Sequence, residues 1–345
     1  MRTNNPMLGK TGIRRGTRSG GLRALNTTVA VIALAFSAVA LVFRAQPVST
    51  IPRLVISVGS TFVPLIALVG LVVAVLARRR LLAVLGVFLV TATIAIQVSW
   101  YYFGHPPKIS EHTEVRVLAS NLRYGLADAE FFVGLAKQSA DVITVAELTK
   151  GAVERFTEAG IDEAFPYSQL NPAPRAGGIG IWSRYPVTQV TAPRRRNVRM
   201  PAARIEVPGV EYEPLVASVH VKSPVAGDEN TIDDWRYGMA GAKAQLDAFA
   251  KEAGPATVII GGDYNSTPDM RQFRDLLTNG YRDAVQQTGS GFAPTFKADS
   301  SWGPPLITID HILTRNAVAS SVRTVKVPGS DHRAVLATIK VPTGS

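Results

Sequence analysis

Three long apolar stretches limit what the first part of this chain can form. They cover residues 24–43, 54–77 and 81–104, and none of them contains a charged side chain. Each has at least the roughly 20 residues that a helix needs to cross about 30 Å of hydrocarbon. Three transmembrane helices are therefore predicted, with buried core helices as the alternative. Trp100, Tyr101 and Tyr102 are typical of an aromatic belt at a membrane surface.

The basic side chains gather around these stretches. Residues 1–114 carry 12 Lys and Arg against 2 Asp and Glu, whereas residues 115–345 carry 25 against 24. The net charge of +11 would ordinarily suggest a nucleic-acid binder, but membrane topology explains this uneven distribution better. The chain has no cysteine, which excludes disulfides, thiolate catalysis and thiolate metal sites.

The same basic residues predict an orientation. Residues 1–23 carry six of them and residues 78–80 carry three, whereas the loop between the first two stretches has only Arg44 and Arg53 at its ends. The positive-inside rule then places the tail and the triple-arginine turn in the cytoplasm. A cleaved signal peptide is the alternative for the first stretch, but the residues after it make a poor cleavage site. We expect a multi-pass protein of the cytoplasmic membrane.

The predicted organisation has four parts. A basic cytoplasmic tail (1–23) and three spans (24–104) precede a short tether (105–114) and an extracytoplasmic domain (115–345), whose mixed apolar patterns are those of an α/β sequence. Strands are predicted at residues 115–119, 142–146, 178–182, 215–219, 257–260, 306–309 and 334–339, and helices at 127–139, 151–159, 235–253 and 270–279.

Polar side chains follow the ends of several predicted strands. Asn121, Glu147 and His220 each come just after an apolar run, and Asp263 and Asn265 follow the run that ends in two glycines. In an extended segment, Asp263 and Asn265 point the same way and can hold one reacting oxygen. Ligands bind beyond the carboxyl ends of strands in open sheets, although antiparallel strands would not place all these residues at one edge.

Two later motifs combine histidine with aspartate. Asp310-His311 lies in a predicted strand, and Asp331-His332 lies in a loop before the closing strand. A histidine held by a carboxylate is a unit for proton transfer. Each polar residue also has a structural alternative, such as an Asx turn, a helix cap or a hydrogen-bonded core histidine.

Together, these motifs resemble those of the endonuclease/exonuclease/phosphatase superfamily, in the same order and over about residues 115–341. The resemblance implies an α+β fold, the four-layer α/β/β/α sandwich of DNase I with two mixed sheets, here preceded by three transmembrane helices. It also implies a phosphoesterase that depends on Mg²⁺ or Mn²⁺. One glutamate is enough to hold Mg²⁺, because this ion keeps several waters and also binds substrate phosphate.

The resemblance implies a role for each motif. Glu147 would ligate the metal, with Asn121 and Asp331 in or beside its shell. Asp263 would orient or deprotonate the attacking water, and Asn265 would hold a phosphoryl oxygen. His332, oriented by Asp310, would transfer a proton or contact the phosphate, and His220 would protonate or hydrogen-bond the leaving oxygen.

The resemblance implies a phosphoester substrate, and the charges of the sequence narrow its class. A nearly neutral domain disfavours nucleic acid, while Arg194, Arg195 and Arg196 suit a phosphate, a pyrophosphate or a lipid headgroup, with a solvated loop as the alternative. The layout is similar to membrane-anchored bacterial members linked to glycopeptide-antibiotic resistance, which implies a polyprenyl phosphate or pyrophosphate. The alternatives are an anchored extracellular nuclease and an inactive membrane-tethered binding protein. No protein partner is predicted.

Overall fold

The computed structural model describes residues 16–104, 106–191, 195–227, 231–297, 299 and 303–344. The chain divides into two compact units. We call the one that contains Phe62–Ile94 and the chain up to Leu41 the helical unit, and the one that contains Val42–Thr61 and the chain from Ala95 onward the sandwich unit.

Three helical segments are long and apolar enough to cross a membrane: Gly21–Ala45, Ile51–Leu76 and Arg80–Tyr101. They belong to α1 (Gly16–Ala45), to α2 (Ile51–Val58) with α3 (Val63–Leu76), and to α4 (Arg80–Tyr101). A 3₁₀ turn (Gly59–Phe62) separates α2 from α3 just before Pro64, whose ring cannot be accommodated inside a regular helix. Within the helical unit, α1, α3 and α4 pack through Leu34, Ala67 and Leu89.

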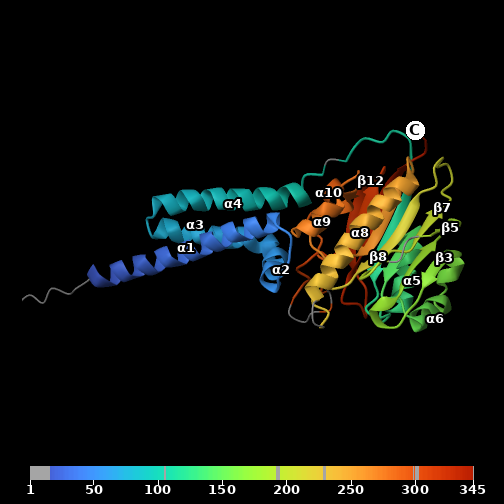
Figure 1. The fold of residues 1–345 in the computed structure, drawn as a ribbon, viewed down its shortest axis with the longest axis horizontal. Coiled ribbons are helices and arrows are strands. Elements are labelled where there is room, and N and C mark those ends of the chain that lie inside the picture. Colours follow the sequence, from blue (N-terminus) through green and yellow to red (C-terminus); the bar gives the residue numbers. More distant parts are fainter. Residues whose placement is uncertain are drawn as a thin grey trace, which may run out of the picture. The chain divides into compact units, whose positions relative to one another are not determined.

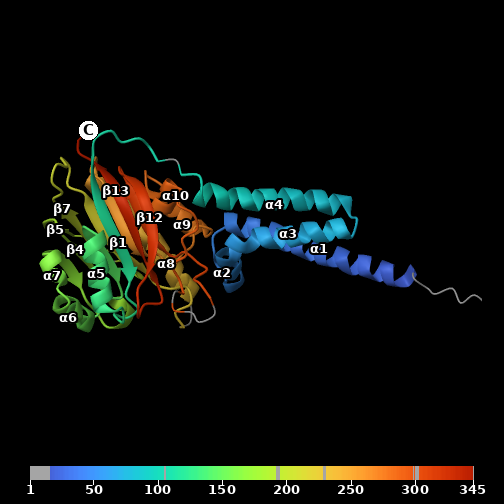
Figure 2. The same ribbon diagram turned by 180° about the vertical axis from the view of Figure 1, so that it is seen from behind.

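The sandwich unit contains two mixed sheets (Figures 1 and 2). One has the order β12-β13-β1-β2-β4-β3 and consists of β1 (His112–Asn121), β2 (Val142–Ala146), β3 (Tyr167–Asn171), β4 (Ile179–Ser183), β12 (Val318–Lys326) and β13 (Arg333–Pro342). The other has the order β10-β11-β9-β8-β7-β5, with β6 paired to β8, and consists of β5 (Val187–Val190), β6 (Val198–Arg199), β7 (Ala202–Ile205), β8 (Leu215–Val221), β9 (Val258–Asp263), β10 (Arg282–Asp283) and β11 (Asp310–Arg315). Among the strands of the described residues, only β1 with β2 and β8 with β9 pair in parallel.

Helices cover the outer faces of both sheets. On the six-stranded sheet, α5 (Ala129–Ser139), α6 (Lys150–Glu158) and α7 (Ile161–Ala164) bury a cluster that includes Phe132, Phe156 and Trp182. On the seven-stranded sheet, α8 (Thr231–Ala253) lies over the strands and runs roughly along them, as Figure 1 shows, and α9 (Arg271–Leu276) packs in the same apolar cluster. The short α10 (Ala284–Thr288) packs against β12. The predicted four-layer sandwich of two mixed sheets is confirmed.

Two consecutive glycines let the sheets approach each other near the end of β9. A Cβ on Gly261 would lie 2.6 Å from Thr144 Oγ1 of the opposite sheet, and Gly262 has a φ of +147°, which side chains disfavour. Ser218 Oγ also donates to Val145 O across the sandwich, at 3.0 Å. The glycine pair therefore serves close packing of the sheets directly behind Asp263.

The sandwich unit includes the ends of the candidate spans. We call residues 42–61 and 95–104 the anchor ends. Four of their side chains are buried in the same apolar cluster as residues of α8, β9 and α9: Val48, Leu54, Trp100 and Tyr101. Trp100 meets Phe273 edge to face, with the ring centroids 6.4 Å apart. The aromatic-belt interpretation is therefore wrong for Trp100 and Tyr101, since both are core residues; Tyr102 is exposed.

The other predicted elements are mostly present, with shifted ends. The strand predicted around Asp310-His311 is present as β11 (Asp310–Arg315), but the predicted strand at residues 306–309 is wrong, because β11 begins only at Asp310 and Ile307 makes an isolated bridge to Phe296. The strand predicted at 257–260 continues through both glycines to Asp263. The helix predicted at 270–279 spans only Arg271–Leu276. Strand β1 begins at His112, inside the predicted tether.

Candidate active site

The pairing of the strands brings the predicted site residues to one edge of the sandwich. Asp263, the last residue of β9, is opposite His220 of β8 on one side and Asp310 of β11 on the other. Because β11 runs antiparallel to β9, its first residue meets the last residue of β9. His332 precedes β13 and lies near the end of β1 for the same reason. The edge therefore combines residues at the ends of the parallel strands β8 and β9 with Asp310 at the start of the antiparallel strand β11.

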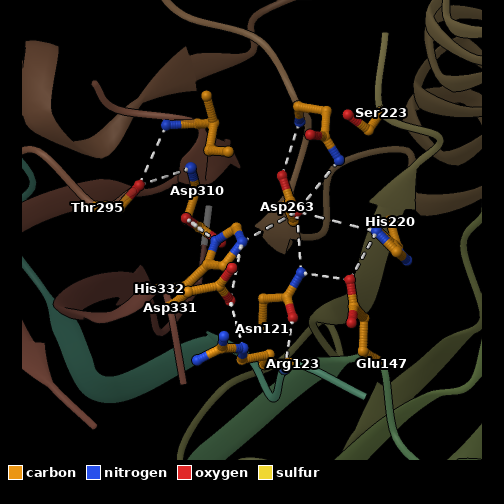
Figure 3. A network of polar contacts seen from close by, with 12 residues as sticks. Asn121, Arg123, Glu147, His220, Ser223, Asp263, Thr295, Asp310, Asp331 and His332 are labelled. Atoms are coloured by element: carbon orange, nitrogen blue, oxygen red, sulfur yellow. Dashed lines mark hydrogen bonds and ion pairs between the residues drawn. The ribbon is translucent and has the colours of Figure 1, made fainter. Parts of the chain in front are cut away.

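Asn121 connects the two sheets at this edge. Its Nδ2 donates to Glu147 Oε1 at 3.1 Å and to Asp263 Oδ2 at 3.0 Å, as Figure 3 shows. Its Oδ1 accepts from Arg123 N at 2.9 Å, which fixes the orientation of the amide. Asn121 is completely buried. It therefore holds two carboxylates from different sheets at a set separation.

Glu147 follows β2 in the left-handed conformation, with a φ of 60°. Its Oε2 accepts from Tyr124 N at 2.7 Å, and its Oε1 lies 3.8 Å from His220 Nε2. A non-glycine residue with positive φ carries backbone strain, which the surrounding bonds must hold in place. These contacts hold the Glu147 carboxylate beside His220.

His332 and Asp310 form a buried pair. His332 Nδ1 lies 2.8 Å from Asp310 Oδ2, while His332 Nε2 lies 4.0 Å from both Asp263 Oδ2 and Asp331 Oδ1. Burial alone would lower the pKa of His332, but Asp310, Asp263 and Asp331 together outweigh it and raise this pKa to about 10. His332 is therefore positively charged at neutral pH, with Nε2 as its free donor.

Asp263 lies at the centre of the network in Figure 3. Its Oδ1 accepts from Asn265 N at 2.7 Å, and Asn265 Nδ2 lies 3.2 Å from Oδ2. Burial, followed by the negative charge of Asp310, raises the pKa of Asp263 to about 6. A carboxylate with this pKa is ionised at neutral pH and is still basic enough to accept a proton.

His220 and Asn265 line the other side of Asp263. His220 Nδ1 lies 3.1 Å from Ala176 O, so Nδ1 carries the proton and Nε2 faces Glu147 and Asp263. Asn265 has a φ of 46°, and its Nδ2 donates to Val221 O at 2.9 Å. In this structure the amide donors of Asn265 are thus engaged by the protein.

These residues open into one cavity of about 970 Å³. Six of its lining residues were predicted for chemistry: Glu147, His220, Asp263, Asn265, Asp331 and His332. Asn121 and Asp310 support them from behind, as buried partners. The cavity gathers groups from strand ends that are far apart in the sequence, as a shared active site requires.

Basic residues line the same cavity as the carboxylates. Arg195 and Arg196 are among them, and their contact with substrate stays a prediction, whereas Arg194 lies outside the described residues. Arg195 Nε lies 3.4 Å from Gln245 Oε1, and Arg196 pairs with Asp234 at 3.3 Å. Arg199 also lines the cavity, because the register of β6 with β8 puts it opposite His220.

Three further cations that the sequence did not indicate line the cavity: Arg123, Lys222 and Lys297. Arg123 Nη1 pairs with Asp299 at 2.8 Å, and Lys222 Nζ pairs with Asp234 at 2.7 Å. Arg123 and Lys222 each follow a predicted site residue, Asn121 or His220, by two positions, just past the end of β1 or β8. Arg123 lies in a turn with a φ of 47°, so strand alternation does not fix its direction. Their nearness in sequence to predicted site residues is the signal that could have revealed them.

The side chains present fit a hard divalent cation. Carboxylate and amide oxygens dominate the acidic side of the cavity, and thiolates are absent from the whole sequence. Asp310 Oδ1 is buried and has no hydrogen-bond partner among the described groups. Asp263, Asp310 and His332 also offer ligand atoms that lie within 4.8 Å of one another. Such a concentration of negative charge favours a nearby cation.

Comparison with known families agrees with this geometry. The sequence profile of the Endonuclease/Exonuclease/phosphatase family matches residues 118–332. The chain belongs to this family. Family membership makes the chain a metal-dependent phosphoesterase of the nuclease and phosphatase class. No curated protein matches the chain significantly.

Solved structures agree with the family fold. TDP2 from D. rerio, in complex with a single-strand DNA product, has a TM-score of 0.52 and 18% identity, over 66% of this chain and 99% of that chain. TDP2 from C. elegans has a TM-score of 0.52 and 13% identity, over 68% of this chain and 77% of that chain. At these low identities, the structural similarity shows the fold alone.

Proposed function

We propose that this family member is a membrane-anchored phosphoesterase that acts outside the cytoplasmic membrane on a lipid-linked phosphate or pyrophosphate. The observation that carries the proposal is the sharing of one apolar core by the anchor ends and the sandwich. An active site built into the same compact unit as the ends of three candidate spans stays near the bilayer. Substrates that remain in the bilayer are then the accessible ones.

The cations of the cavity support an anionic headgroup. Arg195, Arg196, Arg199 and Lys222 line the same cavity as Glu147 and Asp263. Arginine binds phosphate oxygens through its planar fork of donors. This arrangement fits a compact headgroup with one or two phosphates, whereas long duplex DNA calls for a broad positive face.

The orientation rests on the distribution of basic residues around the candidate spans. Arg44 is engaged in a part-buried ion pair with Asp269 at 2.7 Å, so it contributes little free charge to the loop that holds it. The triple-arginine turn at residues 78–80 keeps its charge, which favours a cytoplasmic turn. Protease added to intact cells should then remove the sandwich unit, and a protected sandwich would contradict this orientation.

We assign the metal to the oxygen donors of Glu147, with Asp331 and Asn121 beside it. When bound, the ion would offset phosphate charge and polarise the phosphoryl group. The alternative ligand set of Asp263, Asp310 and His332 is less suitable, because the 2.8 Å bond commits His332 Nδ1 to Asp310. That pair is better suited to holding a proton.

The remaining residues have the following roles in the proposed reaction. Asp263 orients the attacking water and accepts its proton, while His332, positively charged and held by Asp310, donates Nε2–H to a phosphoryl oxygen. Asn265 would contact a second phosphoryl oxygen after releasing one of its internal bonds. His220 would donate to the leaving oxygen through Nε2 once that nitrogen is protonated.

Glu147→Gln should weaken metal binding while keeping the fold. We expect the Mg²⁺ concentration for half-maximal activity to rise by at least about tenfold, because a neutral amide is a poorer ligand than a carboxylate. Mg²⁺ titration of hydrolysis and Mn²⁺ binding by electron paramagnetic resonance would measure it. Glu154→Gln, an exposed change on α6, is the matched control. An unchanged Mg²⁺ requirement would remove Glu147 from the metal site.

The substrate is tested with full-length protein in detergent. With Mg²⁺, the protein should release phosphate from polyprenyl pyrophosphate in mixed micelles, whereas plasmid DNA should stay intact. Degraded DNA with no phosphate released from the lipid would instead favour an anchored nuclease. The single-strand DNA product bound to D. rerio TDP2 is the observation that keeps this second candidate.

A further inference from the structure

A buried carboxylate joins the anchor ends to the catalytic segment. Asp269 is 2% exposed and lies four residues after Asn265. Its Oδ1 accepts from Arg44 Nε at 2.7 Å, and its Oδ2 accepts from Thr61 Oγ1 at 3.1 Å. Gln97 Nε2 lies 3.3 and 3.2 Å from its two oxygens. Each candidate span thus supplies one donor to the same carboxylate.

Further bonds join the same two parts of the chain. Gln272 donates to Val48 O at 2.9 Å and accepts from Val48 N at 3.1 Å. Arg271 Nη1 donates to Ala45 O at 3.2 Å, and Arg274 bonds both Arg44 O and Pro268 O. The start of α9 is therefore hydrogen-bonded to the anchor end at several points, with Asp269 as its charged centre.

The segment between Asp263 and Asp269 is held on its other side by the core of the sandwich unit. Ser266 Oγ accepts from Trp235 Nε1 at 3.1 Å, and Ser266 O lies 3.0 Å from His311 Nε2. Tyr264 packs edge to face on Phe273, with ring centroids 5.7 Å apart. Ser266 therefore fixes the middle of this segment and Asp269 fixes its end, and both contribute to the position of Asn265, whose backbone N–H bonds Asp263 Oδ1.

A purely structural contact at this place would not need a charge. Taking Asp269 and Arg44 out of water costs free energy that their attraction repays only with good geometry. The pair therefore favours the docked arrangement and penalises any state in which the anchor ends withdraw and leave Asp269 buried alone. Docking of the anchor and the shape of the catalytic segment are linked through this carboxylate.

We propose that Asp269 is a positioning residue that makes phosphoester hydrolysis depend on docking of the anchor ends. The inference rests on the proposed hydrolase function but not on the lipid substrate. It assigns to the membrane-spanning part a role in setting the orientation of Asp263 and Asn265, in addition to retention at the bilayer.

The test uses full-length protein in detergent micelles with bis(p-nitrophenyl) phosphate at saturating Mg²⁺. Asp269→Asn and Arg44→Gln should each lower kcat by about tenfold to a hundredfold, because small displacements of reacting groups cost that much. KM should change less than about twofold, and the double variant should be no slower than either single one, as expected for one shared interaction. Thr61→Val is a milder variant that should fold and lower kcat by a smaller factor.

Glu154→Gln is the control, since this exposed carboxylate lies on α6, which packs on the six-stranded sheet; its kcat should equal that of the unmodified protein. A lower Tm with unchanged kcat in Asp269→Asn and Thr61→Val would overturn the proposal and leave Asp269 a structural residue. If the unmodified protein hydrolyses neither this diester nor polyprenyl pyrophosphate under these conditions, the hydrolase function fails instead.

Discussion

Asp263→Asn should lower kcat by about a thousandfold or more, because this side chain is the proposed base and the proposed orienting group for the attacking water. An amide has no basicity at neutral pH, and its NH₂ would face the Nδ2 donor of Asn121. The loss should appear in kcat for both lipid and soluble phosphoesters, since the group acts on the water and not on the leaving group. Steady-state kinetics at saturating Mg²⁺ would measure it.

The same substitution should leave the fold nearly intact. It removes the repulsion between Asp263 and Asp310, which offsets part of the lost hydrogen bonding. The Tm should therefore stay within a few degrees of that of the unmodified protein. Asp233→Asn, an exposed carboxylate on α8, should change neither kcat nor Tm. Full activity in Asp263→Asn would contradict the assignment of the site.

Removal of residues 1–105 should destabilise the sandwich unit strongly. The cut removes four buried core side chains, Val48, Leu54, Trp100 and Tyr101. Burial of each is worth about 1.5–3 kcal/mol, so the loss is on the order of 6–12 kcal/mol, similar to the roughly 5–15 kcal/mol that holds an ordinary domain together. It also leaves Asp269 without Arg44. We expect the fragment to aggregate or to melt well below the full-length protein.

Size-exclusion chromatography and thermal melting followed by circular dichroism would measure the effect. In full-length protein, Trp100→Ala should lower the Tm, whereas Phe88→Ala, an exposed position on α4, should not. A monomeric fragment with the Tm of the full-length protein would mean that the anchor ends do not complete the core. It would also support the predicted boundary between tether and domain near residue 115.

The gathering of the site residues was predictable from sequence because they follow buried, β-branched strands. The runs before Asn121, Glu147 and His220 are apolar and short, and their chain order carries the family pattern. The wrong strand at residues 306–309 came from the same signal, since apolar residues beside Asp310 also suit a loop that packs inside. Strand β12 was missed because its central residues alternate with Ser and Thr and are half-exposed.

The link between anchor and active segment could not be predicted from sequence. Asp269 follows Asn265 and Pro268 and looks like an ordinary turn carboxylate. Arg44 looks like a charge at the end of a span, and Gln97 looks like a tolerated polar residue within one. Their meeting depends on contacts between positions more than 170 residues apart, which no local pattern records. Trp100 was misassigned for the same reason.

Asn121 should make the proposed catalytic centre sensitive to small movements of one sheet relative to the other. It extends from one sheet and grips a carboxylate of the other, so a slight sliding of the two halves would pull the reactive groups apart while every strand stays paired. Hydrolysis would then fade at denaturant concentrations or temperatures where spectroscopy still reports an intact protein. Measurements of kcat should therefore detect a shift between the two sheets before circular dichroism detects a loss of strand structure.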